Sequence, residues 1–298
     1  MRINIMALGD VGQNLLLGLK LLGPGLVDEI GIYDINSKQI ERLEMEMGQI
    51  AYNGAAFPRV VITEEEELLD CDILVFCATK GVPALDAKGD VRMAQLEANG
   101  ELIRTLGERV KAETAHGRIP EYIYVMSDPV DQLCNILLES SGLDATRIRG
   151  LGLGVMNARA IYYAERDDRF LSYLVDGRVY GPHGEGLIVA NSISNYDDEI
   201  SKELTELVKH ANMKVRELGY KPFIAPAISS GALSIIENIK GNWTYGSVYL
   251  ENPFGCTGSS YFGMYSRLSD GKWEIEEVNY SPELLERLQE SFTRGLEL

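Results

Sequence analysis

The feature that most constrains the fold is an alternation of short apolar strands and helices along the first half of the chain. Each predicted strand is apolar throughout, and a helical segment separates most of them. Such strands are buried on both faces, which is typical of a parallel sheet covered by helices. The predicted strands occupy residues 2–8, 29–35, 59–63, 72–78, 122–128 and 147–153. The predicted helices occupy residues 11–22, 36–52, 91–113 and a segment after Pro129.

The second half of the chain combines helices with strands in a different pattern. Strand signals are present at 170–181 and 187–194, and aromatic-rich strands fill 243–279. Asn252-Pro253 and Asp270-Gly271 are turn signals within this last segment. Helices are predicted at 197–218, 225–239 and 282–294. This mixture predicts a smaller α+β unit attached to a doubly wound parallel sheet.

A glycine turn joins the first predicted strand to the first helix, at residues 7–12 (ALGDVG). Gly9 lets the backbone approach a pyrophosphate, and Gly12 lets the helix pack closely on the strand. The free N–H groups at the helix N-terminus offer a site for the phosphates. Ala7 stands where a third glycine is usual, so the glycine pattern is incomplete. The candidate phosphate-binding residues are Gly9, Asp10, Val11 and Gly12.

Asp34 ends the second predicted strand, 22 residues after Gly12. A carboxylate there can hold the two ribose hydroxyls of NAD and would repel the extra phosphate of NADP. Asp34 could instead be the cap of the following helix. Because the strand context and the glycines favour a dinucleotide site, we predict a Rossmann-type NAD-binding domain at 1–150. An α+β substrate domain would then occupy 151–298.

From here the chain resembles the lactate/malate dehydrogenase family over nearly its full length. In that family a glycine-bearing loop follows the fourth strand, and residues 79–83 (TKGVP) are similar to it. An arginine that begins a helix, followed by an asparagine, is similar to Arg92 and Asn99. A later arginine after a small residue matches Arg159, and a Gly-x-His-Gly turn places His183 24 residues further on.

The resemblance implies a NAD-dependent oxidoreductase that reduces a small 2-oxo acid or oxidises the matching 2-hydroxy acid. Arg159 would bind the substrate carboxylate through two parallel hydrogen bonds. Arg92 would polarise the ketone oxygen, and His183 would donate a proton to it in reduction. Each of the three also has a plain structural alternative, as a solvated, ion-paired or turn residue. The other residues that the resemblance assigns to cofactor binding are Thr79, Gly81 and Asn99.

Two positions depart from the family pattern. The family has an aspartate three residues before the arginine that matches Arg159, and here that position is Met156. Because methionine cannot orient an imidazole, His183 should lose a partner and some basicity. The family also has an Asn-Pro pair after the fifth strand, which here is Asp128-Pro129. Asp128 could repel an anionic substrate, or it could replace the missing acid beside His183, which makes it a third catalytic candidate.

The loop between Pro83 and Arg92 is the segment that should select the substrate side chain. Malate-type enzymes place an arginine in this loop, and lactate-type enzymes place a neutral residue. Here the candidates are Asp86, which would favour a neutral or cationic substrate, and Lys88, which would leave a dicarboxylate possible. Both could equally face solvent.

Charge and composition restrict the partners of the chain. Its formal net charge is -17 and its pI is near 4.7, so a nucleic acid is not an expected partner. The four cysteines form no Cys-x-x-Cys pair, and no cluster of ligands suggests a metal. Without a signal-peptide pattern or a membrane-spanning apolar run, a cytoplasmic protein is expected. The resemblance implies a homodimer or a homotetramer.

Two functional hypotheses remain open. The leading one is the NAD-dependent 2-hydroxy acid dehydrogenase. The alternative is a non-catalytic or weakly active NAD-binding sensor or scaffold of the same fold. Met156 and Asp128 favour the alternative, whereas the retention of Arg92, Arg159 and His183 favours the enzyme.

Overall fold

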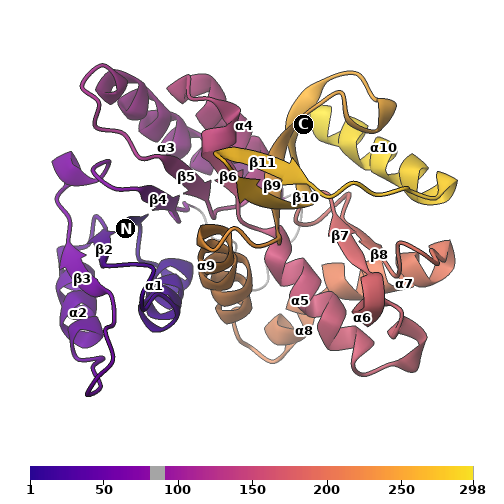
Figure 1. The fold of residues 1–298 in the computed structure, drawn as a ribbon, viewed down its shortest axis with the longest axis horizontal. Coiled ribbons are helices and arrows are strands. Elements are labelled where there is room, and N and C mark those ends of the chain that lie inside the picture. The colour runs from indigo at the N-terminus through magenta and orange to yellow at the C-terminus, as the bar shows by residue number, and fades with distance from the viewer. Residues whose placement is uncertain (81–90, 298) are drawn as a thin grey trace.

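The computed structural model describes residues 1–80 and 91–297, and the side chains of residues 91–94 are not among those described. Its centre is a nine-stranded sheet with the strand order β11-β10-β9-β6-β5-β4-β1-β2-β3 (Figure 1). A separate two-stranded sheet contains β7 and β8. None of the described helices is both long and apolar enough to cross a membrane.

The parallel part of the sheet confirms the alternating pattern of the first half. The strands are β1 (Arg2–Met6), β2 (Glu29–Tyr33), β3 (Arg59–Ile62), β4 (Ile73–Phe76), β5 (Tyr122–Val125) and β6 (Ile148–Gly150). Each pairs in parallel with its neighbours in this half. The strand order places β4 beside β1, so the crossover reverses direction there. The fold is therefore a Rossmann-type doubly wound sheet.

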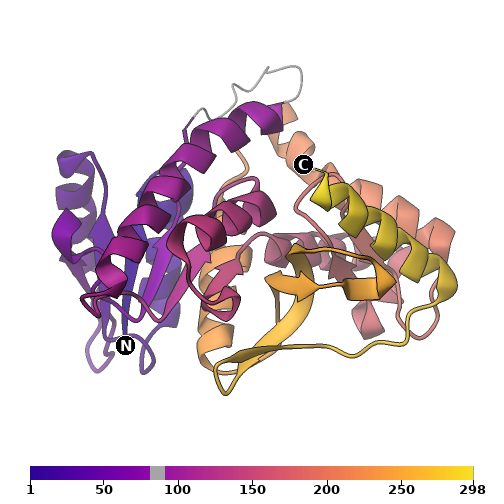
Figure 2. The same cartoon turned by 90° about the horizontal axis from the view of Figure 1, so that it is seen from above.

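Helices cover both faces of the parallel strands. Because side chains along each strand alternate between the two faces, each strand contributes to the core on either side. In β4, Val75 joins the core under α1 and α2, whereas Phe76 joins the core under α3 and α4. Helices α3 and α4 pack against each other on their face (Figure 2). These helices are α1 (Asp10–Leu22), α2 (Ser37–Gly48), α3 (Val91–Thr114) and α4 (Val130–Ser141).

The aromatic-rich strands of the second half extend the same central sheet. They are β9 (Thr244–Glu251), β10 (Ser259–Ser269) and β11 (Lys272–Ile275), and β9 pairs antiparallel with β6. The pairing depends on Gly150, because a Cβ there would lie 2.8 Å from the Cβ of Ser247. The turns predicted at Asn252 and at Asp270-Gly271 are present, with φ of 47°, 50° and 74° at these three residues.

The second half adds further helical segments and two short strands. The segments are α5 (Leu153–Ala164), α6 (Tyr173–Asp176), α7 (Asp198–Lys209), α8 (Ala211–Glu217), the π-helical η4 (Pro226–Ala232), α9 (Leu233–Ile239) and α10 (Pro282–Leu296). The short strands are β7 (Arg178–Tyr180) and β8 (Ile188–Ala190). Single 3-10 turns occupy Glu65–Glu67, Ala145–Arg147, Asp168–Phe170 and Pro253–Gly255.

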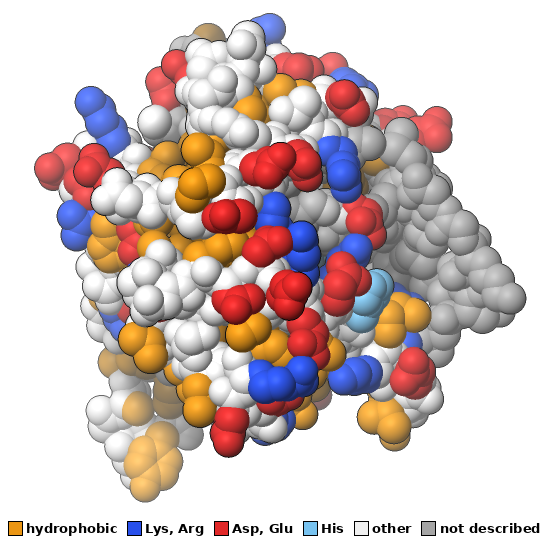
Figure 3. Space-filling model, turned by 90° about the vertical axis from the view of Figure 1, so that its right-hand side faces the viewer, with side chains coloured by type: hydrophobic (Ala, Val, Ile, Leu, Met, Phe, Trp, Pro, Cys, Tyr) orange, Lys and Arg blue, Asp and Glu red, His pale blue; other side chains and the backbone are white. Residues whose placement is uncertain are grey.

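Two predictions for this half were wrong in detail. The strand expected at 170–181 begins only at Arg178, because Phe170 and Tyr173 are buried at helical spacing in the preceding turns. The helix expected at 197–218 is interrupted at His210, whose φ of -96° and ψ of 4° are not helical. On the face of the molecule formed by these helices, acidic and basic side chains are intermixed (Figure 3). Arg169 and Lys202, for example, form ion pairs there with residues of α7.

Candidate active site

The carboxyl ends of β1, β2, β4 and β5 bring together the glycine turn, Asp34, Thr79 and Asp128. In open parallel sheets, ligands bind at this edge, where the strand order reverses. Because parallel strands all end on the same side of the sheet, the candidate residues that follow these strands lie at one edge.

The glycine turn between β1 and α1 has the shape that a dinucleotide site requires. A Cβ at Gly12 would lie 2.0 Å from the carbonyl oxygen of Ala7, so only glycine lets α1 begin this close to β1. At Gly9 no described atom lies within 4 Å of the Cβ position, which leaves open space beside the backbone. Asp10 and Val11 begin α1, whose N–H groups point toward that space.

Ala7 keeps the backbone conformation of the glycine that it replaces. Its φ is 77°, a value that residues with a Cβ adopt at a cost of about 1–2 kcal/mol. The Ala7 N–H donates to the carbonyl oxygen of Tyr33, at 2.8 Å, which holds the turn against the end of β2. The glycine pattern is thus incomplete in sequence but present in the backbone.

Asp34 connects the glycine turn to the end of β2. Its carboxylate accepts hydrogen bonds from the N–H of Leu8, at 2.6 Å, and from the N–H of Asn36, at 2.9 Å. The helix cap of α2 is Asn36, which accepts from Gln39. An ionised carboxylate has about four acceptor positions, so Asp34 can still accept bonds from two ribose hydroxyls. The open space at Gly9, the α1 N-terminus and Asp34 together fit a dinucleotide.

Asn99 holds the ends of β4 and β5 together. Its side chain is fully buried; its amide donates to Thr79 Oγ1, at 3.1 Å, and to the carbonyl oxygen of Asp128, at 2.8 Å. Its Oδ1 accepts from the N–H of Lys80, at 2.7 Å. Both amide protons are thereby used, and Asn99 positions the backbone on either side of the edge; its contact with a cofactor stays a prediction. Thr79 is exposed at the same edge.

A contact between a histidine and a carboxylate joins the two halves of the chain. His183 Nδ1 lies 3.0 Å from Asp128 Oδ1, and the exposed fractions of the two side chains are 22% and 50%. His183 stands in the turn between β7 and β8, where Gly181 has a φ of 86° and its N–H donates to Gly263 of β10. A histidine held by a carboxylate on one ring nitrogen can accept and release a proton on the other.

Arg159 extends from α5 near this pair. Its guanidinium donates to Met156 Sδ, at 3.6 Å, and to the carbonyl oxygen of Val208, at 3.4 Å. Burial lowers the pKa of Arg159, and the negative charge of Asp128 acts to raise it. Among the described residues, no carboxylate lies within 4.0 Å of this guanidinium. A half-buried cation with only weak neutral partners is suited to bind an anion.

Met156 belongs to α5, and its side chain is buried in the apolar core. Its thioether cannot orient the imidazole of His183. Met156 is 1% exposed and packs with Val155 and Phe170, among others. The neighbouring Asn157 points elsewhere, since its Oδ1 accepts a hydrogen bond from Tyr173 at 2.7 Å. Among the described residues, the carboxylate within 4.0 Å of His183 is thus that of Asp128, which follows β5, and not one on α5.

Asp131 is a residue near the site that the sequence analysis missed. It lies in the first turn of α4, is 7% exposed and accepts a hydrogen bond from Ser247 of β9. Burial raises its pKa to about 6, while Ser247 and the charge of His183 act in the opposite direction. The signal in the sequence was an acid beside apolar Val130 and Leu133 at the start of a helix.

Four predicted site residues lie wholly or partly outside the described part of the chain. Gly81, Asp86 and Lys88 are outside it altogether. Arg92 belongs to the first turn of α3, but its side chain is not described. Their roles therefore stay predictions.

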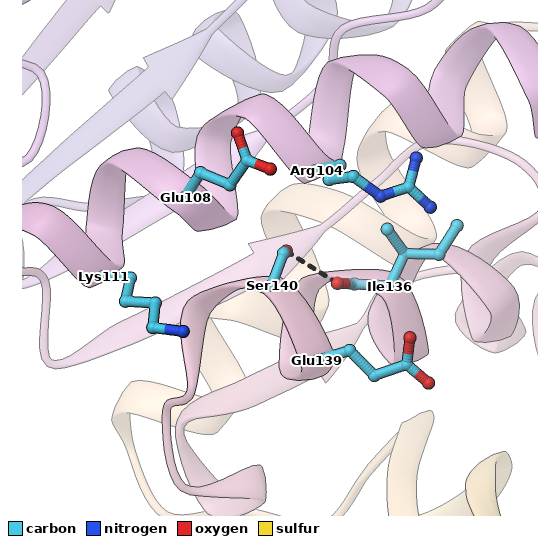
Figure 4. Close-up of a pocket in the computed structure, with 6 residues that line it drawn as sticks. All are labelled: Arg104, Glu108, Lys111, Ile136, Glu139 and Ser140. Carbon is cyan, nitrogen blue, oxygen red and sulfur yellow. Dashed lines mark hydrogen bonds between the residues drawn. The ribbon is translucent and has the colours of Figure 1, made fainter.

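A surface hollow of about 340 Å³ lies between α3 and α4, away from the edge that carries these residues (Figure 4). Arg104, Glu108 and Lys111 line it from α3 and Glu139 from α4, so the charges of its lining are balanced. Ser140 donates to the carbonyl oxygen of Ile136 and offers no free donor there. The hollow has none of the features of a catalytic site.

Comparisons with known proteins cover the whole chain. Residues 1–150 match the family described as lactate/malate dehydrogenase, NAD binding domain. A probable malate dehydrogenase of Campylobacter jejuni is 26% identical, over 99% of this chain and 98% of that protein. An L-lactate dehydrogenase of Staphylococcus haemolyticus is 24% identical, over 91% and 87% of the two chains.

Solved structures show the same fold. The malate dehydrogenase from Archaeoglobus fulgidus, in complex with NADH, has a TM-score of 0.79 at 20% identity, over 100% of this chain and 98% of that one. A minor L-lactate dehydrogenase from Enterococcus mundtii has a TM-score of 0.79 at 20% identity, over 99% and 96%.

Proposed function

This chain belongs to the lactate/malate dehydrogenase family, and from that premise we propose that it transfers a hydride between NAD(H) and a small 2-oxo or 2-hydroxy acid. The observation that carries the proposal is the contact between His183 Nδ1 and Asp128 Oδ1, at 3.0 Å. This contact orients His183 as an acid–base group, although Met156 occupies the position where the family has an aspartate.

The first half of the chain holds the cofactor in this proposal. The N–H groups of Asp10, Val11 and Gly12 bind the pyrophosphate, and Asp34 accepts from the adenosine ribose. Thr79 and Gly81 are further candidates for contact with the cofactor, and Asn99 fixes the backbone at Thr79, Lys80 and Asp128. The bound nicotinamide supplies or accepts the hydride.

His183 moves the proton of the reaction. Because Asp128 occupies Nδ1, the other ring nitrogen is directed to the substrate oxygen. In reduction His183 donates a proton to that oxygen, and in oxidation it accepts one. The Asp128 carboxylate stabilises the charged ring and fixes its tautomer, so the acid that the family carries on α5 has moved to the end of β5.

Two arginines act on the substrate. Arg159 exchanges its weak contacts with Met156 and Val208 for the substrate carboxylate, which is the better partner for a guanidinium. Arg92 polarises the ketone oxygen while charge develops there. Asp86 and Lys88 stay the candidates for contact with the substrate side chain.

The experiment is NADH oxidation by the purified protein with pyruvate, oxaloacetate and branched, aromatic and amine-bearing 2-oxo acids. Each assay is repeated with His183→Asn, and with His210→Asn as the matched control, since His210 is exposed and pairs with Glu206 on α7. We expect turnover that His183→Asn abolishes and His210→Asn preserves. Saturable NADH binding without turnover of any acid would refute the enzyme and favour the NAD-binding sensor.

A further inference from the structure

A segment of the second half reaches the glycine turn of the first. Lys221, in the connection between α8 and η4, has its Nζ 3.5 Å from Asp10 Oδ2, at the first residue of α1. This places an ammonium group at the helix N-terminus where the family binds its dinucleotide.

The helix η4, which follows Lys221 in the chain, packs against α1. At Gly18 of α1 a Cβ would lie 2.5 Å from the Cβ of Ala232 and 2.9 Å from Ile228, so the two helices touch closely. Ala227 and Ala232 of η4 are fully buried in this contact. Lys221 thus lies a few residues before a helix that is packed on α1, and its own contact with Asp10 reaches the first turn of α1.

Asp10 creates an electrostatic problem at this place. A carboxylate in the first turn is favourable for an empty helix. Once a pyrophosphate lies over the same turn, the carboxylate repels it, because two like charges near a protein surface interact unfavourably. A nearby cation removes this penalty.

We propose that Lys221 is a cofactor-binding residue that contacts the pyrophosphate of the dinucleotide and neutralises Asp10 beside it. This inference rests on the proposed binding of NAD by residues 1–150. The side chains of Lys221 and Asp10 are 55% and 46% exposed, so the ammonium can turn from carboxylate to phosphate without disturbing the core. Three rotatable donors on a flexible stem suit a lysine to both partners.

The test is to titrate NADH, ADP-ribose and adenosine into the full-length protein at low salt. The variants are Lys221→Met, Lys221→Arg and Asp10→Asn. Lys240→Met is the matched control, because Lys240 forms a similar exposed ion pair with Glu237 at the far end of α9. All variants are checked by thermal melting.

We expect Lys221→Met to weaken the binding of NADH and ADP-ribose about fivefold to tenfold. The binding of adenosine should be unchanged, because adenosine carries no phosphate. Lys221→Arg should bind like the wild type, and Asp10→Asn should bind NADH more tightly and shrink the effect of Lys221→Met in the double variant. Lys240→Met should change nothing.

Two outcomes would overturn the inference in different ways. If the wild type binds NADH and Lys221→Met binds it equally well, the role of Lys221 is refuted while the proposed NAD function stands. If the wild type binds neither NADH nor ADP-ribose, the proposed function fails, and the inference fails with it. An equal loss for adenosine would show that Lys221 only supports the fold.

Discussion

At the scale of single residues, the proposed catalytic pair has its carboxylate at another position than the family pattern. Met156 is part of the apolar core, and the carboxylate beside His183 comes from Asp128 at the end of β5. A proton-transfer group needs an orienting acid within hydrogen-bond reach, whichever element carries it. Behind the pair lies Asp131, a buried acid whose charge interacts with both His183 and Asp128.

Replacing Asp128 with asparagine tests the relocated acid. The amide preserves the size of the side chain but cannot stabilise a charged imidazole, so we expect kcat to fall roughly 10²–10⁴-fold. Steady-state oxidation of NADH with the best 2-oxo acid measures the change. Asp144→Asn is the control, because Asp144 only caps the 3-10 turn at 145–147. Unchanged kcat in Asp128→Asn would show that the contact with His183 has no part in catalysis.

Asp131 predicts a pH dependence of stability. Its folded pKa of about 6 lies above the ordinary value of 3.8, so between these values the folded state binds more protons than the unfolded state. The free energy of unfolding therefore falls as the pH rises through this window. Once the pH lies above the window, the total decrease is on the order of 3 kcal/mol. Asp131→Asn keeps an acceptor for Ser247 and should lose this dependence.

Urea unfolding at pH 4.5 and 7.5 measures that difference for the wild type and for Asp131→Asn. Groups that do not interact with Asp131 titrate equally in both proteins, so the difference between the two pH slopes reports on Asp131 and on the two groups coupled to it, His183 and Asp128. Parallel slopes would mean that Asp131 is charged in the folded protein over the whole range.

At the scale of elements, close contacts between backbones position the site. α1 starts beside β1 because Gly12 has no Cβ, and β9 joins β6 because Gly150 has none. The second contact adds β9, β10 and β11 to the parallel sheet, and the turn that holds His183 rests on β10 through Gly181 and Gly263. The distance between His183 and Asp128 thus depends on how the strands of the second half attach.

Gly150→Ala is a test of this attachment. The added Cβ would lie 2.4 Å from Val130 Cγ1 and 2.8 Å from Ser247 Cβ, so β9 or α4 must shift. We expect the free energy of unfolding to decrease by about 1–3 kcal/mol, measured in urea. Gly48→Ala, where no described atom lies within 4 Å of the new Cβ, is the control and should be neutral or slightly stabilising. Equal stability of the two variants would show that the strand joint adapts without cost.

At the scale of the whole molecule, both halves contribute to each part of the proposed site. Asp128 comes from the first half and His183 from the second. The Asp10–Lys221 ion pair likewise joins the two halves, at the proposed cofactor site. The proposed boundary near residue 150 falls within a continuous sheet, since β6 pairs with β5 on one side and with β9 on the other. The substrate domain of the proposal is therefore an extension of the nucleotide-binding sheet.

The outer surface predicts self-association. Helices α5 and α6 expose large apolar side chains, with Tyr162 52% and Val175 84% exposed. Such exposed apolar side chains often mark an interface, which agrees with the homodimer or homotetramer implied by the family. We expect light scattering to give two or four times the chain mass of 33.0 kDa. A single mass of 33.0 kDa at micromolar concentration would contradict this.

The sequence alone determined the parallel sheet, the glycine turn, the acid at Asp34 and the order of the candidate residues. These depend on local patterns: apolar strands, helix periodicity and short motifs. The sequence also offered two roles for Asp128 without choosing between them. The cofactor contact that the resemblance assigns to Asn99 stays a prediction, and its burial and hydrogen-bond partners are not local properties that the sequence could supply.

Only the tertiary structure decided which distant residues meet. Asp128 and His183 are 55 residues apart, and Asp10 pairs with a lysine of the other half. Buried Asp131 becomes notable only because β9 covers it and brings Ser247 to its carboxylate. Each of these contacts depends on how β9 and η4 pack against the parallel sheet, and that packing follows from close approaches between elements far apart in the chain, which no local pattern contains.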